Sequence, residues 1–276
     1  MKITPEIIKS RQNPTVKWAA SLSQKKHRDE HGVFIAEGEK LTIEAAEAGL
    51  EITHVFVMES RRERVIARIE DAFGSEKYKN TALVVLADDV FEKISTEKAP
   101  QGVISVIKYL DFFRELDIIY KEDFFLMEGE RALALSSVRD PGNLGSVIRS
   151  AVAFGVDHIV LSGDSADIYN PKTVRSAMGS LYRVKVTTVK DFSSFVSSAK
   201  ENGRRVFAAE LSENARPLSE VGVTPTDVFM IGNEGHGIPA ELSAITSGSV
   251  YIPISKRTES LNAAVAAAIF MWEQSK

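Results

Sequence analysis

The sequence contains no cysteine among its 276 residues. Disulfide bonds and thiolate metal sites are therefore excluded, and the composition fits a reducing cytoplasm. No apolar run approaches the roughly 20 residues of a membrane-spanning helix, and the N-terminus lacks an apolar core of signal-peptide length. We therefore expect a cytoplasmic protein with no membrane partner.

Sequence signatures of several enzyme classes are also missing. The chain has five histidines and no cysteine, so we expect no metal site. The glycine-rich loop Gly232–Gly237 lacks the spacing of a dinucleotide fingerprint, and no Gly-Lys-Ser/Thr closes it as in a phosphate-binding loop. No Gly-x-Ser-x-Gly elbow offers a hydrolase nucleophile. The plain alternative for this loop is that its glycines only permit a left-handed turn.

The net charge of −4 argues against a uniformly basic nucleic-acid binder, so an RNA partner would have to meet local patches. Residues 1–28 form such a patch, because Glu6 is their only acidic residue among several lysines and arginines. The alternative is a solvated helix face. The predicted RNA contacts in this stretch are Arg11, Lys25, Lys26 and Arg28.

The order of apolar and polar segments predicts two domains. From Gly32 to Lys108, short apolar strands alternate with helical segments, which indicates a compact α/β domain over residues 1–110. Residues 111–130 are rich in acidic and aromatic side chains, and we interpret them as an acidic linker with some helical character, part of which packs on a neighbour. A second α/β domain follows over residues 131–276.

Two short apolar runs organise the second domain. Val228–Ile231 and Val250–Ile254 are brief, β-branched and cut off by Gly or Pro, so we predict buried strands of a parallel sheet. The first leads into the Gly232–Gly237 loop. The second leads into a polar loop that ends at Ser260, the predicted N-cap of a helix over Leu261–Trp272. Two strand ends and an open helix N-terminus predict a ligand site at the carboxyl edge of the sheet.

A third loop brings more polar side chains to the same edge. After an earlier apolar strand, Asp140–Asn143 forms a predicted turn, and the following helix carries Arg149 off its apolar stripe. These side chains suit a ligand with phosphates or ribose hydroxyls, as do Ser260 and Asn262 after the later strand. Each also has a purely structural interpretation, as a cap, a surface ion pair or a polar residue in a first helical turn.

These loops resemble the three signature motifs of the SpoU-type (TrmH-like) RNA ribose 2′-O-methyltransferases, a branch of the SPOUT superfamily. The matching stretches are Asp140–Gly145 with Arg149 and Ala153–Gly155, then Ile231–Gly237, then Ile252-Pro253 with Ser260–Asn262. The N-terminal part is similar to the family's RNA-binding module, which has a ribosomal-protein-like α/β fold. It matches at Ser10–Pro14, Lys25-Lys26, Glu37–Lys40 and Glu97–Val103, so the resemblance covers nearly the whole chain.

The resemblance implies a SPOUT α/β domain with a parallel sheet and a deep trefoil knot at its C-terminal end, beside a smaller α/β RNA-binding domain. It also implies that S-adenosyl-L-methionine binds in the knotted loops, at Gly232, Ile252 and Leu261. Family members are dimers whose active site is completed across the interface. We therefore expect a homodimer through the C-terminal domain.

By resemblance Arg149 is the catalytic candidate, and Asn143, Glu234, Ser260 and Asn262 position or support the substrate. A free guanidinium has a pKa above about 12 and stays protonated. We therefore expect Arg149 to hold the adjacent phosphate and orient the hydroxyl rather than act as a base. The predicted reaction is S-adenosyl-L-methionine-dependent methylation of a ribose 2′-hydroxyl in RNA, with ribosomal RNA as the favoured substrate.

Three alternatives stay open at this point. Related methyltransferases act on transfer RNA, a non-catalytic RNA-binding protein would keep the same fold, and a small-molecule enzyme would use a nucleotide cofactor on a similar sheet. The intact motif residues speak against the second alternative. The basic N-terminus and the missing dinucleotide fingerprint speak against the third.

Overall fold

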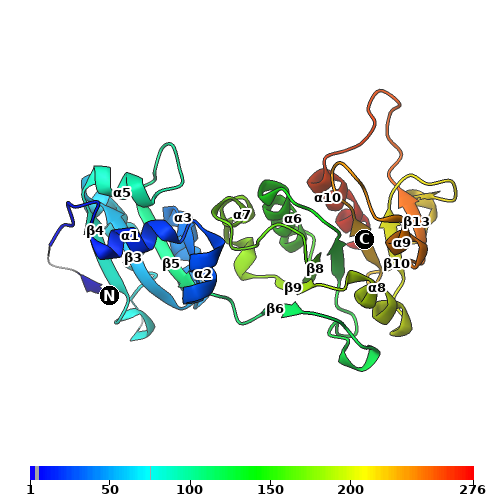
Figure 1. Cartoon of the computed structure of the whole chain (residues 1–276), viewed down its shortest axis with the longest axis horizontal. Helices are drawn as coiled ribbons and strands as arrows, with labels where there is room; N and C mark the ends of the chain where they lie inside the picture. Colours follow the sequence, from blue (N-terminus) through cyan, green and yellow to red (C-terminus); the bar gives the residue numbers. More distant parts are fainter. Residues whose placement is uncertain (4–5, 75) are drawn as a thin grey trace. The chain divides into compact units, whose positions relative to one another are not determined.

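The computed structural model describes residues 1–3, 6–74 and 76–276. They form two compact units (Figure 1). The N-terminal unit consists of Met1–Leu110 with Asp167–Tyr182, and the C-terminal unit consists of Asp111–Ala166 with Arg183–Lys276. Residues 4 and 5, which fall within the predicted basic stretch 1–28, lie outside the described residues.

A five-stranded mixed sheet forms the centre of the N-terminal unit, in the order β1-β4-β3-β5-β2. β5 runs antiparallel to both β2 and β3, whereas β3 and β4 are parallel. The alternation of apolar strands and helices in this part of the sequence predicts strands at Ile52–Met58 and Val103–Lys108, and both are confirmed, as β3 and β5. The other strands are β1 (Lys2–Ile3), β2 (Val33–Glu37) and β4 (Ala82–Leu86).

Helices pack around this sheet, and the sequence explains where the first one begins. α1 starts at Pro14 because proline suits a first helical turn and because Asn13 caps the helix, accepting from the Thr15 N–H at 2.9 Å. The helices are α1 (Pro14–Ser21), α2 (Lys25–His31), α3 (Glu39–Glu47), α4 (Arg62–Ile69) and α5 (Asp88–Ile94), with short 3₁₀ turns at Glu59–Arg61 and Glu76–Tyr78.

One helix of the N-terminal unit comes from a distant part of the sequence. The sequence pattern places a helix near Val174–Met178 in the second predicted domain, but α7 (Pro171–Ala177) packs against β2 of the N-terminal unit. Just before α7, the Tyr169 ring stacks on Phe34 with centroids 4.8 Å apart. Local periodicity does not reveal such a tertiary contact. A 3₁₀ turn, Met178–Tyr182, follows α7.

The C-terminal unit is built on an eight-stranded sheet in the order β11-β13-β10-β12-β7-β8-β9-β6. Every neighbouring pair is parallel, which confirms the predicted α/β class with a parallel sheet. The strands are β6 (Phe113–Leu116), β7 (Ala132–Leu135), β8 (His158–Ser162), β9 (Lys185–Val189), β10 (Val206–Ala209), β11 (Arg216–Pro217), β12 (Val228–Ile231) and β13 (Gly248–Tyr251).

Helices cover both faces of the eight-stranded sheet. Ala134 and Met230 belong to a buried cluster with residues of α8 and α9. On the other face Phe229 packs against Phe270 of α10, with ring centroids 4.8 Å apart, and α10 packs against α6. The helices are α6 (Pro141–Ala153), α8 (Phe192–Glu201), α9 (Ala240–Ala244) and α10 (Ala263–Gln274), with 3₁₀ turns at Lys121–Asp123 and Leu218–Glu220.

The acidic stretch 111–130 belongs to this unit rather than bridging two domains. β6 pairs with β9 at the edge of the sheet. Ile119 and Leu126 are buried in the core, and Phe124 and Phe125 pack against it. The apolar residues between the acids therefore supply packing, and the linker expected from the acidic composition is part of the folded unit.

Two element boundaries near the candidate site differ from the prediction. β13 covers Gly248–Tyr251 rather than Val250–Ile254, and α10 begins at Ala263 rather than Leu261. Asn262 caps α10, because its side chain accepts from the N–H groups of the first helical turn. The prediction that Ser260 is the N-cap was therefore wrong.

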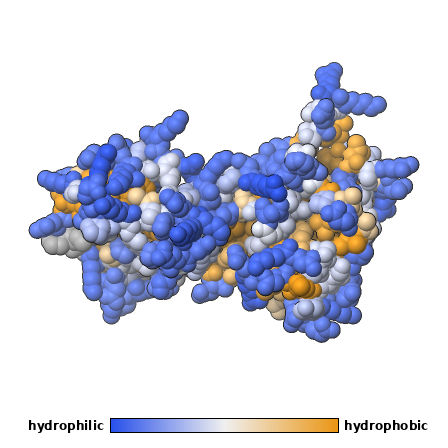
Figure 2. Space-filling view, viewed as in Figure 1, coloured by the Kyte–Doolittle hydropathy of each residue, from blue (hydrophilic) through white to orange (hydrophobic). Residues whose placement is uncertain are grey.

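Hydrophilic residues cover most of the visible surface, whereas hydrophobic residues gather on parts of the C-terminal unit (Figure 2). Val265 and Trp272 on α10 are among the exposed large hydrophobic side chains. Within the described part of the chain, no helix combines the length and the apolar composition needed to cross a membrane.

Candidate functional site

The site lies where the connections of the C-terminal sheet change direction. β7 and β12 are parallel neighbours, but α6 follows β7 on the face shared with α10, whereas α9 follows β12 on the face shared with α8. A crevice opens at the carboxyl ends of strands whose connections diverge in this way, and ligands of parallel sheets bind there. The crevice is therefore set by topology before any side chain is considered.

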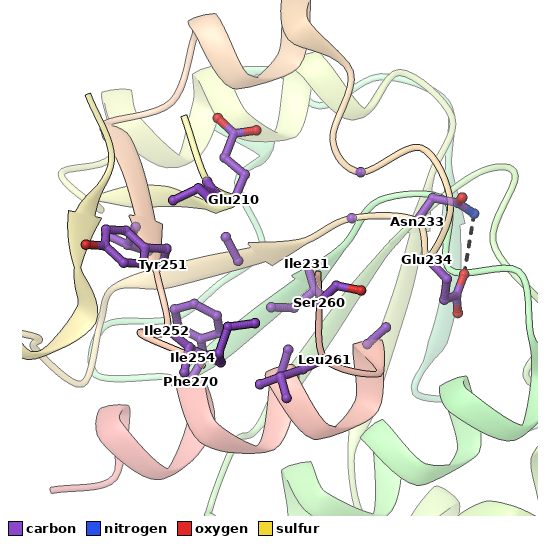
Figure 3. Close-up of a pocket in the computed structure, with 17 residues that line it drawn as sticks. Glu210, Ile231, Asn233, Glu234, Tyr251, Ile252, Ile254, Ser260, Leu261 and Phe270 are labelled. Carbon is purple, nitrogen blue, oxygen red and sulfur yellow. Dashed lines mark hydrogen bonds between the residues drawn. The ribbon is translucent and has the colours of Figure 1, made fainter. Parts of the chain in front are cut away.

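A pocket of about 360 Å³ opens at this edge of the sheet (Figure 3). Gly232, Ile252 and Leu261, which are the three residues expected to bind S-adenosyl-L-methionine, all line it. The structure thus brings together residues from the loops after β12 and β13 and from the approach to α10. The rest of the wall is mainly apolar or aromatic, with Ile231, Val250, Tyr251 and Phe270, and its polar members include Asn233, Glu234 and Ser260.

Gly232 is required by the close approach of its own loop. The backbone N–H of Asn233 donates to the Gly237 carbonyl oxygen and the Gly237 N–H donates back, both at 3.0 Å. A Cβ atom on Gly232 would lie 2.5 Å from the Gly237 carbonyl carbon. This contact lies within one loop. The threading of the predicted knot stays a prediction.

Three predicted site residues form one hydrogen-bonded chain. The Asn143 Nδ2 donates to Glu234 Oε1 at 2.8 Å, and the Asn262 Nδ2 donates to Asn143 Oδ1 at 3.0 Å. Because Asn262 Oδ1 also accepts from the backbone N–H groups of Ala264 and Val265, its amide orientation is fixed. The first turn of α10, the first turn of α6 and the glycine-rich loop are therefore joined by side chains.

Arg149 stands apart from this cluster. It is exposed on α6, forms no ion pair among the described residues, and does not line the pocket that contains Gly232. Its guanidinium donors therefore face solvent. Ser260 lines the pocket and is exposed, so its hydroxyl is also accessible. No three His, Cys, Asp or Glu residues in the described chain could together hold a metal ion.

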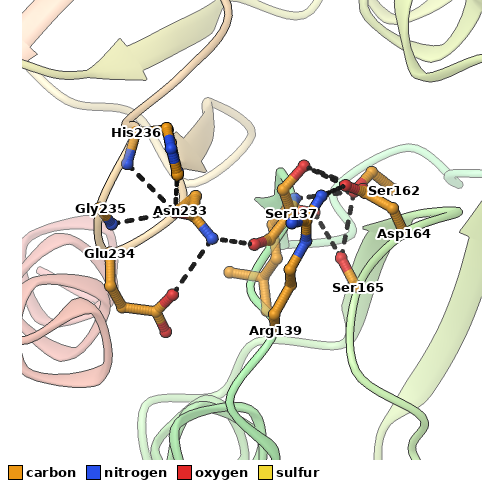
Figure 4. Close-up of polar contacts among 10 residues, drawn as sticks. Ser137, Arg139, Ser162, Asp164, Ser165, Asn233, Glu234, Gly235 and His236 are labelled. Carbon is orange, nitrogen blue, oxygen red and sulfur yellow. Dashed lines mark hydrogen bonds and ion pairs between the residues drawn. The ribbon is translucent and has the colours of Figure 1, made fainter.

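A second polar network lies at the ends of β7 and β8, and the sequence prediction missed it (Figure 4). The Asp164 carboxylate accepts from the hydroxyls of Ser137 and Ser162 and from Arg139 Nη2 at 2.8 Å. Burial alone would raise the pKa of Asp164, but the hydrogen bonds from Arg139, Ser162 and Ser137 outweigh it and lower this pKa to about 2. The only signal in the sequence was the position of Ser137 and Asp164, which follow the short apolar runs 132–135 and 158–161.

Another hollow, of about 520 Å³, lies over α6 and α10. Asn143 and Asn262 line it, so it adjoins the hydrogen-bonded chain. Its apolar side chains are accessible, since Val265 is 49% and Trp272 is 53% exposed. The Phe154 ring meets Trp272 edge to face, with centroids 5.9 Å apart. These side chains form an apolar face that a folded monomer leaves uncovered.

The predicted RNA contacts of the N-terminal unit have different environments. Arg28 is only 1% exposed, donates to the carbonyl oxygens of Leu22 and Ser23, and pairs with Asp167 at 2.5 Å. Arg28 thus ties α2 to the segment just before α7. Because its guanidinium is buried and paired, it cannot contact RNA, and that assignment was wrong. Three predicted contacts remain at the surface, namely Arg11 paired with Asp89, Lys25 paired with Asp29, and Lys26.

Comparison with protein families matches both halves of the chain. Residues 130–272 match the model of the SpoU rRNA Methylase family, and residues 13–105 match the model of the MRM3-like substrate binding domain.

Two relatives are similar over almost the whole length. The 23S rRNA (guanosine(2553)-2′-O)-methyltransferase RlmP of Bacillus subtilis is 31% identical over 265 residues, which are 96% of this chain and 97% of that protein. The 23S rRNA (uridine(2479)-2′-O)-methyltransferase of Streptomyces viridochromogenes is 27% identical over 274 residues, covering 96% of this chain and 90% of that protein. A solved structure agrees, since the AdoMet-bound rRNA methyltransferase from Sinorhizobium meliloti has a TM-score of 0.76 at 30% identity, covering 99% and 97% of the two chains.

Proposed function

Because the chain belongs to the SpoU rRNA methylase family, we propose that it methylates a ribose 2′-hydroxyl of ribosomal RNA with S-adenosyl-L-methionine as the donor. One observation carries the proposal. Gly232, Ile252 and Leu261 line a single pocket, and Glu234 at its rim is bonded to Asn143. Similar proteins named as ribosomal RNA methyltransferases extend over the whole chain.

The pocket fits the proposed donor. The flat base of a nucleoside requires apolar walls, and Ile252 and Leu261 provide them, while Gly232 lines the same pocket. S-adenosyl-L-methionine would supply an electrophilic methyl group on sulfonium when bound. The described residues offer no metal cluster, and the residues of this chain can act by positioning and by charge stabilisation.

The polar residues have distinct roles in this proposal. Glu234 and Asn262 hold the Asn143 amide between them, so Asn143 presents a fixed side chain at the meeting point of α6 and α10. Ser260, exposed at the pocket, orients the ribose. Arg149 binds the phosphate next to the target ribose, because a guanidinium forms paired hydrogen bonds with phosphate. It thereby orients the 2′-hydroxyl, which releases its proton to solvent as its oxygen takes the methyl group from sulfonium.

We also propose a homodimer through α6 and α10. The hollow over these helices exposes Val265 and Trp272, and a partner would bury them. Arg149 lies on α6 outside the pocket of its own chain, so a site completed by the partner would bring an arginine to each donor pocket. The apolar face and the isolated arginine thus have one explanation.

We propose that the N-terminal unit, residues 1–110 with 167–182, is the RNA substrate-binding domain and that the rest of residues 131–276, together with the stretch 111–130, forms the methyltransferase domain. The match to the MRM3-like substrate binding domain over residues 13–105 supports the first assignment. The exposed cations Arg11, Lys25 and Lys26 remain the proposed phosphate contacts, whereas Arg28 is replaced by a structural role.

Transfer of a labelled methyl group tests the proposal. The purified protein is incubated with methyl-labelled S-adenosyl-L-methionine and either unmodified 23S ribosomal RNA or a pool of unmodified transfer RNAs. We expect label in ribosomal RNA at one position, resistant to alkaline hydrolysis as a 2′-O-methyl group is. Label confined to transfer RNA would mean that the substrate is transfer RNA and not ribosomal RNA. Absence of donor binding by calorimetry would favour a non-catalytic RNA-binding protein.

A further inference from the structure

Ser137, two residues beyond the end of β7, has an unfavourable backbone conformation. Its φ is 58°, in the left-handed region, and among the described residues Met178 is the only other non-glycine residue with positive φ. Such a conformation persists where surrounding contacts determine it, and it is concentrated at functional sites. The contacts that stabilise this conformation of Ser137 therefore bear on the function of the site.

Every polar group of Ser137 is hydrogen bonded. Its N–H donates to Ser162 Oγ at 2.7 Å, and its hydroxyl donates to the two Asp164 oxygens at 2.9 and 2.7 Å. Its carbonyl oxygen accepts from Asn233 Nδ2 at 2.8 Å. The loop after β8 thus fixes Ser137, and Ser137 in turn fixes a side chain in the loop after β12.

Asn233 organises the glycine-rich loop from within. Its Oδ1 accepts from the backbone N–H groups of Gly235 at 2.9 Å and His236 at 3.1 Å. Because the other end of the same amide donates to Ser137, the loop cannot rotate as a body without breaking that bond. Figure 4 shows the whole path, with Asn233 between the loop on one side and Ser137 and Asp164 on the other.

We propose that Asp164 is a positioning residue for the methyl donor, acting through Ser137 and Asn233 to hold the Gly232–Gly237 loop in its binding shape. The inference rests on the proposed function, because it assumes that the donor occupies the pocket this loop lines. Asp164 is itself not among the residues that line the pocket. Its low pKa keeps it charged, and so a strong acceptor, at any physiological pH.

The network has two branches that mutation can separate. One branch runs from Asp164 through the Ser137 hydroxyl to the loop. The other is the ion pair with Arg139, whose side chain is 64% exposed. Such a solvated pair contributes little to stability, and among the described residues Arg139 makes no hydrogen bond to the Gly232–Gly237 loop. Arg139→Gln is therefore a matched control that removes a partner of Asp164 and leaves the path to Asn233 intact.

Donor binding by calorimetry, with S-adenosyl-L-methionine and its demethylated product as probes, is the main readout. We expect Asp164→Ala to weaken binding by about tenfold, the size expected for loss of hydrogen bonds to a charged group. Asp164→Asn keeps a carbonyl acceptor for the two hydroxyls and should recover most of the affinity. Arg139→Gln should bind within about twofold of the wild type.

Two further measurements separate positioning from general destabilisation. In Asp164→Ala the KM for the donor should rise while kcat at saturating donor stays nearly unchanged, and hydrogen exchange should accelerate at Gly235 and His236 but not in β7 or β12. Asn233→Ala should also weaken binding, and the double variant Asp164→Ala with Asn233→Ala should be no weaker than the worse single variant, because both lie on one path.

The outcomes distinguish this inference from the proposed function. If the wild type binds no donor, the proposed function fails. If the wild type binds and Asp164→Ala binds equally well, only the positioning role is overturned. Equal losses in Asp164→Ala and Arg139→Gln, or a loss in Asp164→Ala accompanied by faster exchange throughout the sheet, would also overturn it, since the effect would then not run through Ser137.

Discussion

Asn262 makes two kinds of contact with one side chain. Its Oδ1 caps α10 by accepting from Ala264 and Val265, and its Nδ2 donates to Asn143. The first contact stabilises a helix and the second orients a proposed site residue. Aspartate at position 262 would keep the oxygen that caps α10 and lose the N–H that donates to Asn143. The contribution of the cap and that of the bond to Asn143 can therefore be measured separately.

We expect Asn262→Asp to fold with nearly unchanged stability and to lose methyl transfer. Aspartate caps as well as asparagine and suits the helix dipole, but it cannot donate to Asn143. Asn262→Ala should lose both contacts, and its cap alone is worth about 1 kcal/mol. Thermal unfolding and methyl transfer measured on both variants check this, and full activity in Asn262→Asp would remove the link to Asn143 from the mechanism.

Arg149 gives a second prediction for a single side chain. Arg149→Ala should bind S-adenosyl-L-methionine normally, because Arg149 does not line the pocket. Methyl transfer should fall by about 100-fold or more, as when a group that positions the substrate is removed. Calorimetry and single-turnover transfer on the same preparation separate the two effects. Unchanged turnover would exclude Arg149 from catalysis.

At the scale of elements, the glycine-rich loop provides a matched pair of substitutions. A Cβ on Gly232 would meet the Gly237 backbone at 2.5 Å, whereas a Cβ on Gly235 would meet nothing closer than Asn233 Oδ1 at 3.6 Å. We expect Gly232→Ala to displace the loop and abolish detectable donor binding, and Gly235→Ala to bind normally. Calorimetry with the donor checks both, and equal affinities would show that the loop tolerates the displacement.

Short apolar strands were the most predictable elements. β3, β5, β7 and β12 have the predicted bounds because these short, mostly buried apolar runs end at polar or glycine residues. β6 was not predicted, since only one edge of it pairs and two of its four residues, Arg114 and Glu115, are charged. Edge strands of this kind carry little apolar pattern.

The candidate site was predictable to the extent that its residues follow strands. Gly232, Ile252 and Leu261 meet in one pocket because parallel strands end at the same edge. The cap of α10 was misplaced because Ser260 and Asn262 both favour that position, and only the hydrogen bonds decide between them. Asp164 was missed because two of its partners, Ser137 and Arg139, are distant in sequence.

For the molecule as a whole, one buried histidine sets a dependence of stability on pH. Burial lowers the pKa of His158 to about 4, although the carboxylate of Glu130, 3.9 Å from its Nδ1, opposes the shift. A histidine in an unfolded chain has a pKa near 6.5. Between these values the unfolded state binds more protons, so the free energy of unfolding falls as the pH decreases from about 6.5 towards 4.

We expect the wild type to lose about 2 kcal/mol of stability through this group between pH 7 and pH 5. His158→Gln removes the titrating group and should show a flatter profile over this range, though a lower stability at pH 7. Urea unfolding at several pH values checks the difference in slope. Parallel profiles for the two proteins would mean that His158 does not titrate in this way.

The proposed dimer yields a prediction for the assembly. Trp272→Glu places a charge in the apolar face over α6 and α10 and should produce monomers with little methyl transfer. Tyr120→Glu changes a side chain of similar exposure, 61% against 53%, outside that face, so it serves as the control. Sedimentation velocity and transfer assays check both variants, and a dimeric, active Trp272→Glu would place the interface elsewhere.

The helix α7 has a consequence for how such a protein can be divided or recombined. A fragment that ends at residue 110 would lack Asp167 and Tyr169, and Arg28 would then keep a buried charge without its counterion. A C-terminal fragment beginning at residue 111 would carry α7 with its packing surface bare. The N-terminal unit therefore cannot be exchanged between homologues by a single crossover. A chimaera must take residues 167–182 from the same parent as residues 1–110.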